Sequence, residues 1–164
     1  MTANWKIAAF ATAALVGLAV PASAQSFTLL ATLTGAGEAT QTANGINTGA
    51  FGDATVIVDL AARTVTYTVR VFNLPSGVTA SHIHVGSALT PGPVVVNFAP
   101  PVTASNDFGF TGVVRDTEFA LQPDKGIRTP DDMFQAILGG NSYVNVHSQV
   151  NPGGEIRGQL TLKP

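Results

Sequence analysis

The fold is decided by the stretch Thr64-Val65-Thr66-Tyr67-Thr68-Val69-Arg70-Val71. Polar and apolar residues alternate along it, and successive side chains of a β-strand point to opposite faces. The valines and Tyr67 are therefore expected to face a core, while the threonines and Arg70 face solvent. The connection 59–63 before this stretch is short, which predicts a hairpin with the preceding strand.

Runs rich in Val, Ile, Thr and aromatic residues recur along the chain, separated by Gly, Pro, Asn and Asp. This pattern is typical of an all-β domain. No internal repeat is present, and the irregular stretches are too short to be linkers, so one domain over 25–164 is predicted. We expect strands at residues 27–34, 50–59, 64–72, 80–85, 93–98, 108–115, 142–148 and 155–162.

One segment predicts a helix instead. Thr129 is suited to the N-cap and Pro130 to the first helical position, and two aspartates follow near the positive end of the helix dipole. Met133, Phe134, Ile137 and Leu138 would form one apolar stripe before Gly139-Gly140 ends the helix. A helix of this length, near 130–138, is expected to close one end of a β-sandwich core.

The first 24 residues have the pattern of a secretory signal peptide. Lys6 precedes the apolar run 7–20, and Ala22-Ser23-Ala24 supplies the small residues of a cleavage site, with cleavage after Ala24. The run is shorter than the about 20 residues that a membrane helix needs. We therefore expect a periplasmic or secreted protein with no membrane span after signal removal.

Composition excludes several functions. The chain has no cysteine, so disulfides, thiolate metal sites and thiol catalysis are absent. One of the eight basic residues lies in the signal segment, which leaves seven basic against ten acidic residues in the predicted mature chain. Such a chain carries no basic patch, and a nucleic-acid partner is not expected.

Two of the three histidines stand in the motif Ser81-His82-Ile83-His84-Val85. Residues i and i+2 of a strand share a face, so His82 and His84 should project together while Ile83 and Val85 enter the core. The third histidine, His147, lies in the segment 143–148, where Val144 and Val146 have the core phase. Tyr143, Asn145 and His147 should therefore lie on the opposite face.

The segment 154–160 places Glu155, Arg157 and Gln159 on one polar face. The turn Asn151-Pro152-Gly153-Gly154 favours a hairpin with 143–148, in which Asn145 pairs with Arg157 and His147 with Glu155. The core phase of this last strand is Ile156, Leu160 and Leu162.

Taken in order, these motifs resemble the CHRD (chordin-type) domain family over about residues 27–162. The resemblance rests on Gly37-Glu38, the -HIH- pair, Gly92-Pro93-Val94-Val95-Val96, -YVNVH- and -GEIRGQL-. Two departures stand out: Ala39-Thr40-Gln41 replaces the usual prolines, and Ser81 replaces the usual alanine. The resemblance implies an extracytoplasmic Greek-key β-sandwich of the immunoglobulin or superoxide-dismutase type. It implies little about activity.

A looser resemblance is to copper–zinc superoxide dismutases, which also place a His-x-His pair on a sandwich strand and another histidine on a late strand. By this analogy His82, His84 and His147 would form a three-imidazole copper site. Independently of the analogy, neutral imidazoles suit copper or zinc, and Glu155 beside His147 would be a fourth ligand or an acceptor that orients an imidazole. Asn145 and Arg157 would be supporting residues. The alternative is a polar network in which the histidines hydrogen-bond Glu155, Arg157 and loop carbonyls.

Catalysis is not expected. Only three histidines are present, so none is left for the bridging ligand and second metal of a dismutase, and no nucleophile elbow of the Gly-x-Ser-x-Gly type occurs. Two functions stay open. The first is a non-enzymatic extracytoplasmic module that binds an unknown protein or surface partner through its loops. The second is a periplasmic copper-binding metalloprotein with redox activity.

Overall fold

A computed structural model of the chain describes residues 25–38, 45–88, 90–103 and 105–164. The predicted signal peptide lies outside these residues. Short 3-10 turns occur at Gly35–Gly37, Asp116–Glu118 and Pro123–Lys125. The strands are β1 Ser26–Thr34, β2 Phe51–Asp59, β3 Thr64–Phe72, β4 Val78–Val85, β5 Val94–Asn97, β6 Phe108–Arg115, β7 Ser142–Ser148, β8 Ile156–Gln159 and β9 Thr161–Leu162.

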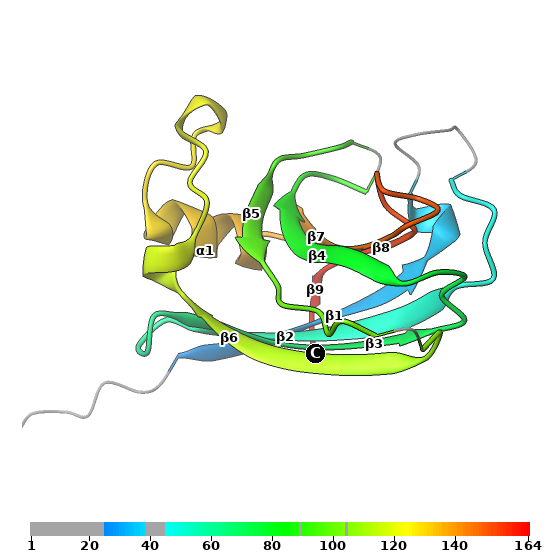
Figure 1. Cartoon of the computed structure of the whole chain (residues 1–164). Helices are drawn as coiled ribbons and strands as arrows, with labels where there is room; N and C mark the ends of the chain where they lie inside the picture. The colour runs from blue at the N-terminus through cyan, green and yellow to red at the C-terminus, as the bar shows by residue number, and fades with distance from the viewer. Residues whose placement is uncertain (1–24, 39–44, 89, 104) are drawn as a thin grey trace, which may run out of the picture.

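The strands form one antiparallel path in the order β5-β4-β7-β8-β1-β2-β3-β6, with β9 paired to β1. Figure 1 shows that this path folds over into two layers, one of β5, β4, β7 and β8 and the other of β1, β2, β3 and β6. After the β4–β5 pair, the chain returns to place β6 beside β3, which is a Greek-key connection. The predicted all-β sandwich is confirmed.

The core lies between the layers and follows the alternation seen in the sequence. On β3, Val65, Val69 and Val71 are fully buried and Tyr67 is nearly so. The predicted hairpin is present, since β2 pairs with β3 from Asp59↔Thr64 onward. Tyr67 also stacks on Phe98, with 3.9 Å between ring centroids, and its hydroxyl accepts a hydrogen bond from the Ala99 N–H.

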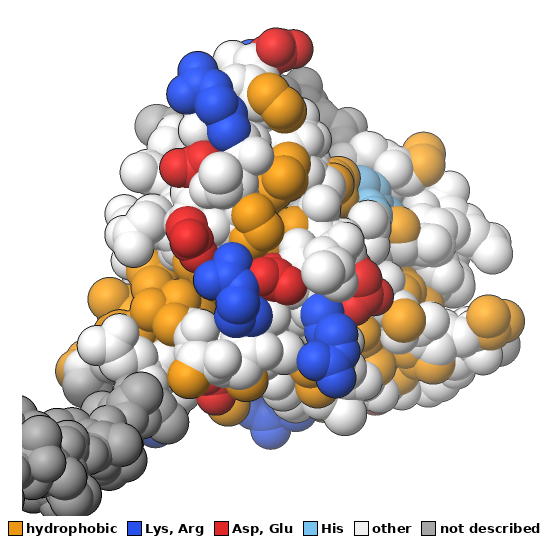
Figure 2. Space-filling model, turned by 90° about the vertical axis from the view of Figure 1, so that its left-hand side faces the viewer, with side chains coloured by type: hydrophobic (Ala, Val, Ile, Leu, Met, Phe, Trp, Pro, Cys, Tyr) orange, Lys and Arg blue, Asp and Glu red, His pale blue; other side chains and the backbone are white. Residues whose placement is uncertain are grey.

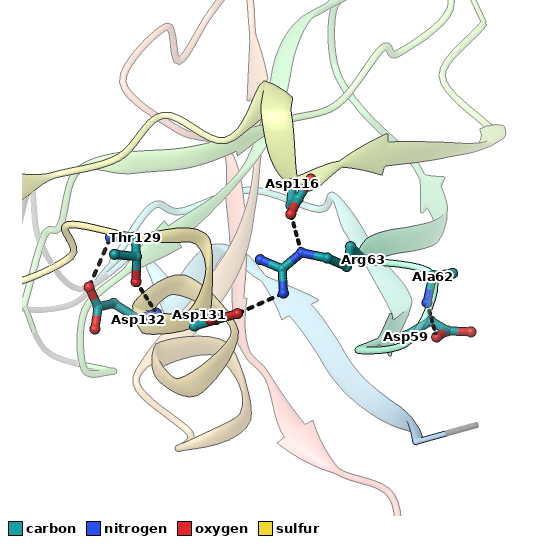
Figure 3. Close-up of polar contacts among 7 residues, drawn as sticks. All are labelled: Asp59, Ala62, Arg63, Asp116, Thr129, Asp131 and Asp132. Atoms are coloured by element: carbon teal, nitrogen blue, oxygen red, sulfur yellow. Dashed lines mark hydrogen bonds and ion pairs between the residues drawn. The ribbon is translucent and has the colours of Figure 1, made fainter. Parts of the chain in front are cut away.

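The predicted helix, α1 (Pro130–Leu138), is confirmed and closes one end of the sandwich (Figure 1). Its N-terminus is capped as expected, because the Thr129 hydroxyl accepts a hydrogen bond from the Asp132 N–H. The Arg63 guanidinium bridges Asp116 and Asp131 and so ties α1 to the β2–β3 turn (Figure 3). Figure 2 shows charged side chains gathered at this end beside hydrophobic ones. Met133, Phe134 and Ile137 are buried.

One expectation about the C-terminal strand is wrong. The predicted strand 155–162 is divided into β8 and β9, and Leu162, assigned to the core phase, is 49% exposed. Leu160 is fully buried, but beyond it the chain leaves β7 and pairs with β1. The change of partner strand interrupts the alternation, so the phase of Ile156 does not extend to Leu162.

Candidate metal centre

The three histidines lie together on the outer face of the layer that contains β4 and β7. His82 and His84 extend from β4 and His147 from the neighbouring β7. The ladder pairs His82 with Asn145, which places His147 two residues further along the same face of β7. The antiparallel pairing of two motifs far apart in the sequence therefore brings the three imidazoles side by side.

The imidazoles are close enough to share one ion. Each offers a ring nitrogen, and the three nitrogens all lie within 4.8 Å of one another. The His82 ring centroid is 5.5 Å from that of His84 and 5.0 Å from that of His147. Metal–nitrogen bonds of about 2.0 Å require the nitrogens to be separated by less than twice that length, so a small inward movement completes the contact.

Backbone carbonyls fix the tautomers of two of these rings. The Nδ1 atom of His84 lies 2.9 Å from the Gly92 carbonyl oxygen, and Nδ1 of His147 lies 2.8 Å from that of Pro152. A carbonyl oxygen can only accept, so each Nδ1 carries the proton and each Nε2 presents a lone pair. This is the arrangement that orients a metal-binding imidazole.

The remaining nitrogens lack partners. Nε2 of His84, Nε2 of His147 and Nδ1 of His82 are buried atoms with no hydrogen-bond partner among the described residues. Buried polar atoms are normally hydrogen-bonded, so three orphan nitrogens in one place call for a ligand or water. The polar-network alternative accounts for the Nδ1 contacts of His84 and His147 and leaves this trio unexplained.

The pKa values of two of these rings, His82 and His84, are lowered, so both are neutral at physiological pH. Burial, together with the neighbouring His147 and His84, lowers the pKa of His82 to about 4. Burial likewise lowers the pKa of His84, although its contact with the Gly92 carbonyl acts in the opposite direction. Because a metal binds the neutral imidazole, protons do not compete for these two ligands near pH 7.

The low pKa of His82 predicts a pH dependence of stability for the metal-free protein. An unfolded histidine takes up a proton below about 6.5, whereas folded His82 resists protonation until about 4. Its contribution to the free energy of unfolding is therefore present above pH 6.5 and is lost as the pH falls toward 4. The free energies of unfolding of the wild type and of His82→Gln, measured in urea, should converge or cross as the pH falls through this interval. A constant difference from pH 7 to pH 4 would contradict the assignment.

The face that carries the histidines is covered. All residues of β7 except His147 are buried, on both faces of the strand. The described residues of the connection between β4 and β5 (86–88 and 90–93) pack over it. The Tyr143 hydroxyl accepts from the Gly92 N–H at 3.1 Å, and the Gln159 amide donates to the Gly86 carbonyl at 3.0 Å. The strand phase was predicted correctly, but the face opposite the core forms a second, polar interior.

Arg157 belongs to this second interior. Its side chain is 2% exposed and donates from Nη2 to the carbonyls of Ser87 at 2.5 Å and Thr90 at 3.2 Å. The guanidinium carbon lies 3.4 Å from the centre of the Tyr143 ring, and Tyr143 stacks on His84 with 4.8 Å between centroids and 4° between planes. Arg157 and Glu155, which the sequence pattern places on one polar face, are therefore both buried and not exposed to solvent.

The hairpin register is as predicted, with Asn145 opposite Arg157 and the ladder ending at Val146↔Ile156. The role of Glu155 differs. Its carboxylate is fully buried and accepts from the Ser148 hydroxyl at 2.7 Å and the Asn151 amide at 2.6 Å. Among the described residues, the Nδ1–H groups of His84 and His147 are oriented by the carbonyls of Gly92 and Pro152 and not by Glu155.

Glu38 is the residue whose role the sequence left open. It is 2% exposed, and its carboxylate accepts a hydrogen bond from the Asn145 amide. Burial raises the pKa of Glu38 to about 7, against the opposing effects of Arg157 and Asn145. The signal for Glu38 in the sequence was its position in the motifs of the family resemblance. Its contact with Asn145 joins residues 107 positions apart, so local pattern does not reveal it.

Fold and site together define a Greek-key β-sandwich domain with a candidate three-histidine metal centre on one outer face. The chain belongs to the CHRD domain family, whose profile matches residues 29–160. Neither a curated protein nor a solved structure shows significant similarity to the chain. Within the described residues, no helix is both long and apolar enough to cross a membrane.

Proposed function

We propose that this chain is an exported, non-enzymatic CHRD-domain protein that binds one copper or zinc ion through His82, His84 and His147. Two observations carry the proposal. The three imidazoles offer ring nitrogens that lie within 4.8 Å of one another, and each ring has a buried nitrogen with no hydrogen-bond partner among the described residues. Two of the rings are held in the ligand tautomer by the carbonyls of Gly92 and Pro152.

The donor set favours these metals. Neutral imidazole suits copper and zinc, whereas calcium and magnesium require oxygen ligands. Three protein nitrogens leave at least one position of a tetrahedral ion for water or another small ligand. The three histidine side chains are only partly exposed. They would supply three ligands from a largely preformed site.

Binding is favoured over catalysis because the chain has no further histidine with which to bridge a second metal ion. The redox-active metalloprotein considered from the sequence would use the same three ligands. Export is supported by the signal-like residues 1–24, and a periplasmic or secreted location follows from it. The predicted protein or surface partner stays a prediction.

The proposal is tested by stripping purified protein with a chelator, dialysing it, and titrating it with Cu²⁺ and with Zn²⁺. We expect one equivalent of at least one of these ions to bind and to raise the unfolding temperature, because an ion that binds only the native state stabilises it. Elemental analysis after gel filtration checks the stoichiometry. If neither ion is retained and saturating metal leaves the unfolding temperature unchanged, the proposal is wrong.

A further inference from the structure

We infer that Arg157 acts through Tyr143 to make the three-histidine centre favour copper in its monovalent state, Cu⁺, over Cu²⁺. This inference rests on the proposed metal-binding function. It adds the preferred oxidation state and assigns the tuning of that preference to a residue that touches no metal ligand.

The structural basis is a stack of three planar groups. The Arg157 guanidinium lies over one side of the Tyr143 ring, 3.4 Å from its centroid, and the Tyr143 ring stacks nearly parallel on His84. The positive charge is thus held at a fixed place next to a ligand of the centre.

The positive charge of Arg157 is weakly compensated. Its hydrogen bonds recorded in the structure go to two neutral carbonyls, those of Ser87 and Thr90. Glu38 interacts with it electrostatically, but burial raises the pKa of Glu38 to about 7, so the carboxylate is only partly ionised at neutral pH. At low dielectric such a charge acts over a longer range than it would in water.

The ligands themselves add no negative charge. Three neutral imidazoles leave the full charge of the ion in place, and repulsion from the guanidinium is twice as large for Cu²⁺ as for Cu⁺. Cu⁺ also tolerates three-coordinate nitrogen sites, whereas Cu²⁺ favours tetragonal sites with more ligands. The charge of Arg157 and the number of ligands therefore both favour Cu⁺ over Cu²⁺.

A purely structural role for Arg157 makes a different prediction. The same residue holds the β4–β5 connection, and therefore the Gly92 carbonyl, over the site. Loosening that connection would weaken the binding of both oxidation states alike. Removal of the charge would change the ratio of the two affinities, so this ratio is the quantity to measure.

The experiment measures Cu⁺ affinity anaerobically and Cu²⁺ affinity in air, each by competition with a chromophoric chelator, for the wild type, Arg157→Gln and Arg70→Gln. Arg70 is the matched control, because it lies on the outer face of β3 and pairs with Asp53 at the surface. We expect the wild type to bind Cu⁺ more tightly than Cu²⁺. In Arg157→Gln this preference should fall by about tenfold, which corresponds to a decrease of about 59 mV in reduction potential. Arg70→Gln should keep the wild-type ratio.

The wild-type measurement is decisive even if Arg157→Gln does not fold. Wild-type protein that binds Cu²⁺ as tightly as Cu⁺, or that binds zinc but no copper, would overturn this inference and leave the metal-binding proposal intact. An unchanged ratio in folded Arg157→Gln would also overturn it. If neither copper nor zinc binds, the metal-binding proposal falls and this inference falls with it.

Discussion

A variant carrying both His82→Ala and His84→Ala is expected to lose affinity for Cu²⁺ or Zn²⁺ by more than about 100-fold. Two of the three nitrogens of the centre are removed, and loss of even a group that orients a ligand costs about 10- to 100-fold. Titration of chelator-stripped protein measures the effect. Circular dichroism should show the same β-sheet content as in the wild type, because both side chains lie on the face opposite the hydrophobic core.

The matched control is a double substitution with the same spacing on another strand, Thr66→Ala with Thr68→Ala. Both threonines lie on the face of β3 that points away from the core. This variant should bind metal like the wild type. Equal affinity in the histidine variant and in this control would show that the metal binds elsewhere on the chain.

Gly92→Ala is expected to destabilise the protein by about 3 kcal/mol or more. A Cβ atom at this position would lie 1.5 Å from the Val85 carbonyl oxygen and 2.5 Å from the Val85 carbonyl carbon. These are backbone atoms at the end of β4 and cannot rotate away, so the β4–β5 connection has to move. The free energy of unfolding in urea measures the loss.

The same variant should also bind metal more weakly, by about 10- to 100-fold, because the Gly92 carbonyl orients His84. Gly49→Ala is the control: nothing lies within 4 Å of a Cβ at that position, so stability should be unchanged or slightly higher. Stability and affinity of Gly92→Ala equal to those of Gly49→Ala would refute the proposed role of the connection.

Much of the fold could be predicted because it depends on local pattern. Alternation fixed the inward faces of β3 and β7, and the cap Thr129 with Pro130 located α1. The end of the chain was harder, because the transfer of β9 to β1 depends on a strand more than a hundred residues earlier. No local pattern at Leu160 signals a change of partner.

The histidines could be selected from the sequence because strand phase places side chains on faces. The partners that orient them could not. The acceptors for His84 and His147 are backbone carbonyls of Gly92 and Pro152, and a carbonyl belongs to every residue type. Which carbonyl lies in reach depends on how a connection folds over the strand.

The strand phase of a residue indicates only whether its side chain points toward the core or away from it. It does not say whether another segment covers that face. The sequence pattern therefore placed Arg157 on a polar face without showing that Ser87 and Thr90 cover it. Glu38 became part of the same interior through a contact that spans most of the domain.

The most direct test of the three-histidine centre is a crystal structure of the copper-loaded protein with anomalous data collected at the copper edge. We expect one anomalous peak at about 2.0–2.1 Å from Nδ1 of His82, Nε2 of His84 and Nε2 of His147, with the Gly92 and Pro152 carbonyls still bound to the opposite ring nitrogens. A peak at any other place on the chain, or copper held by fewer than two of these histidines, would contradict it.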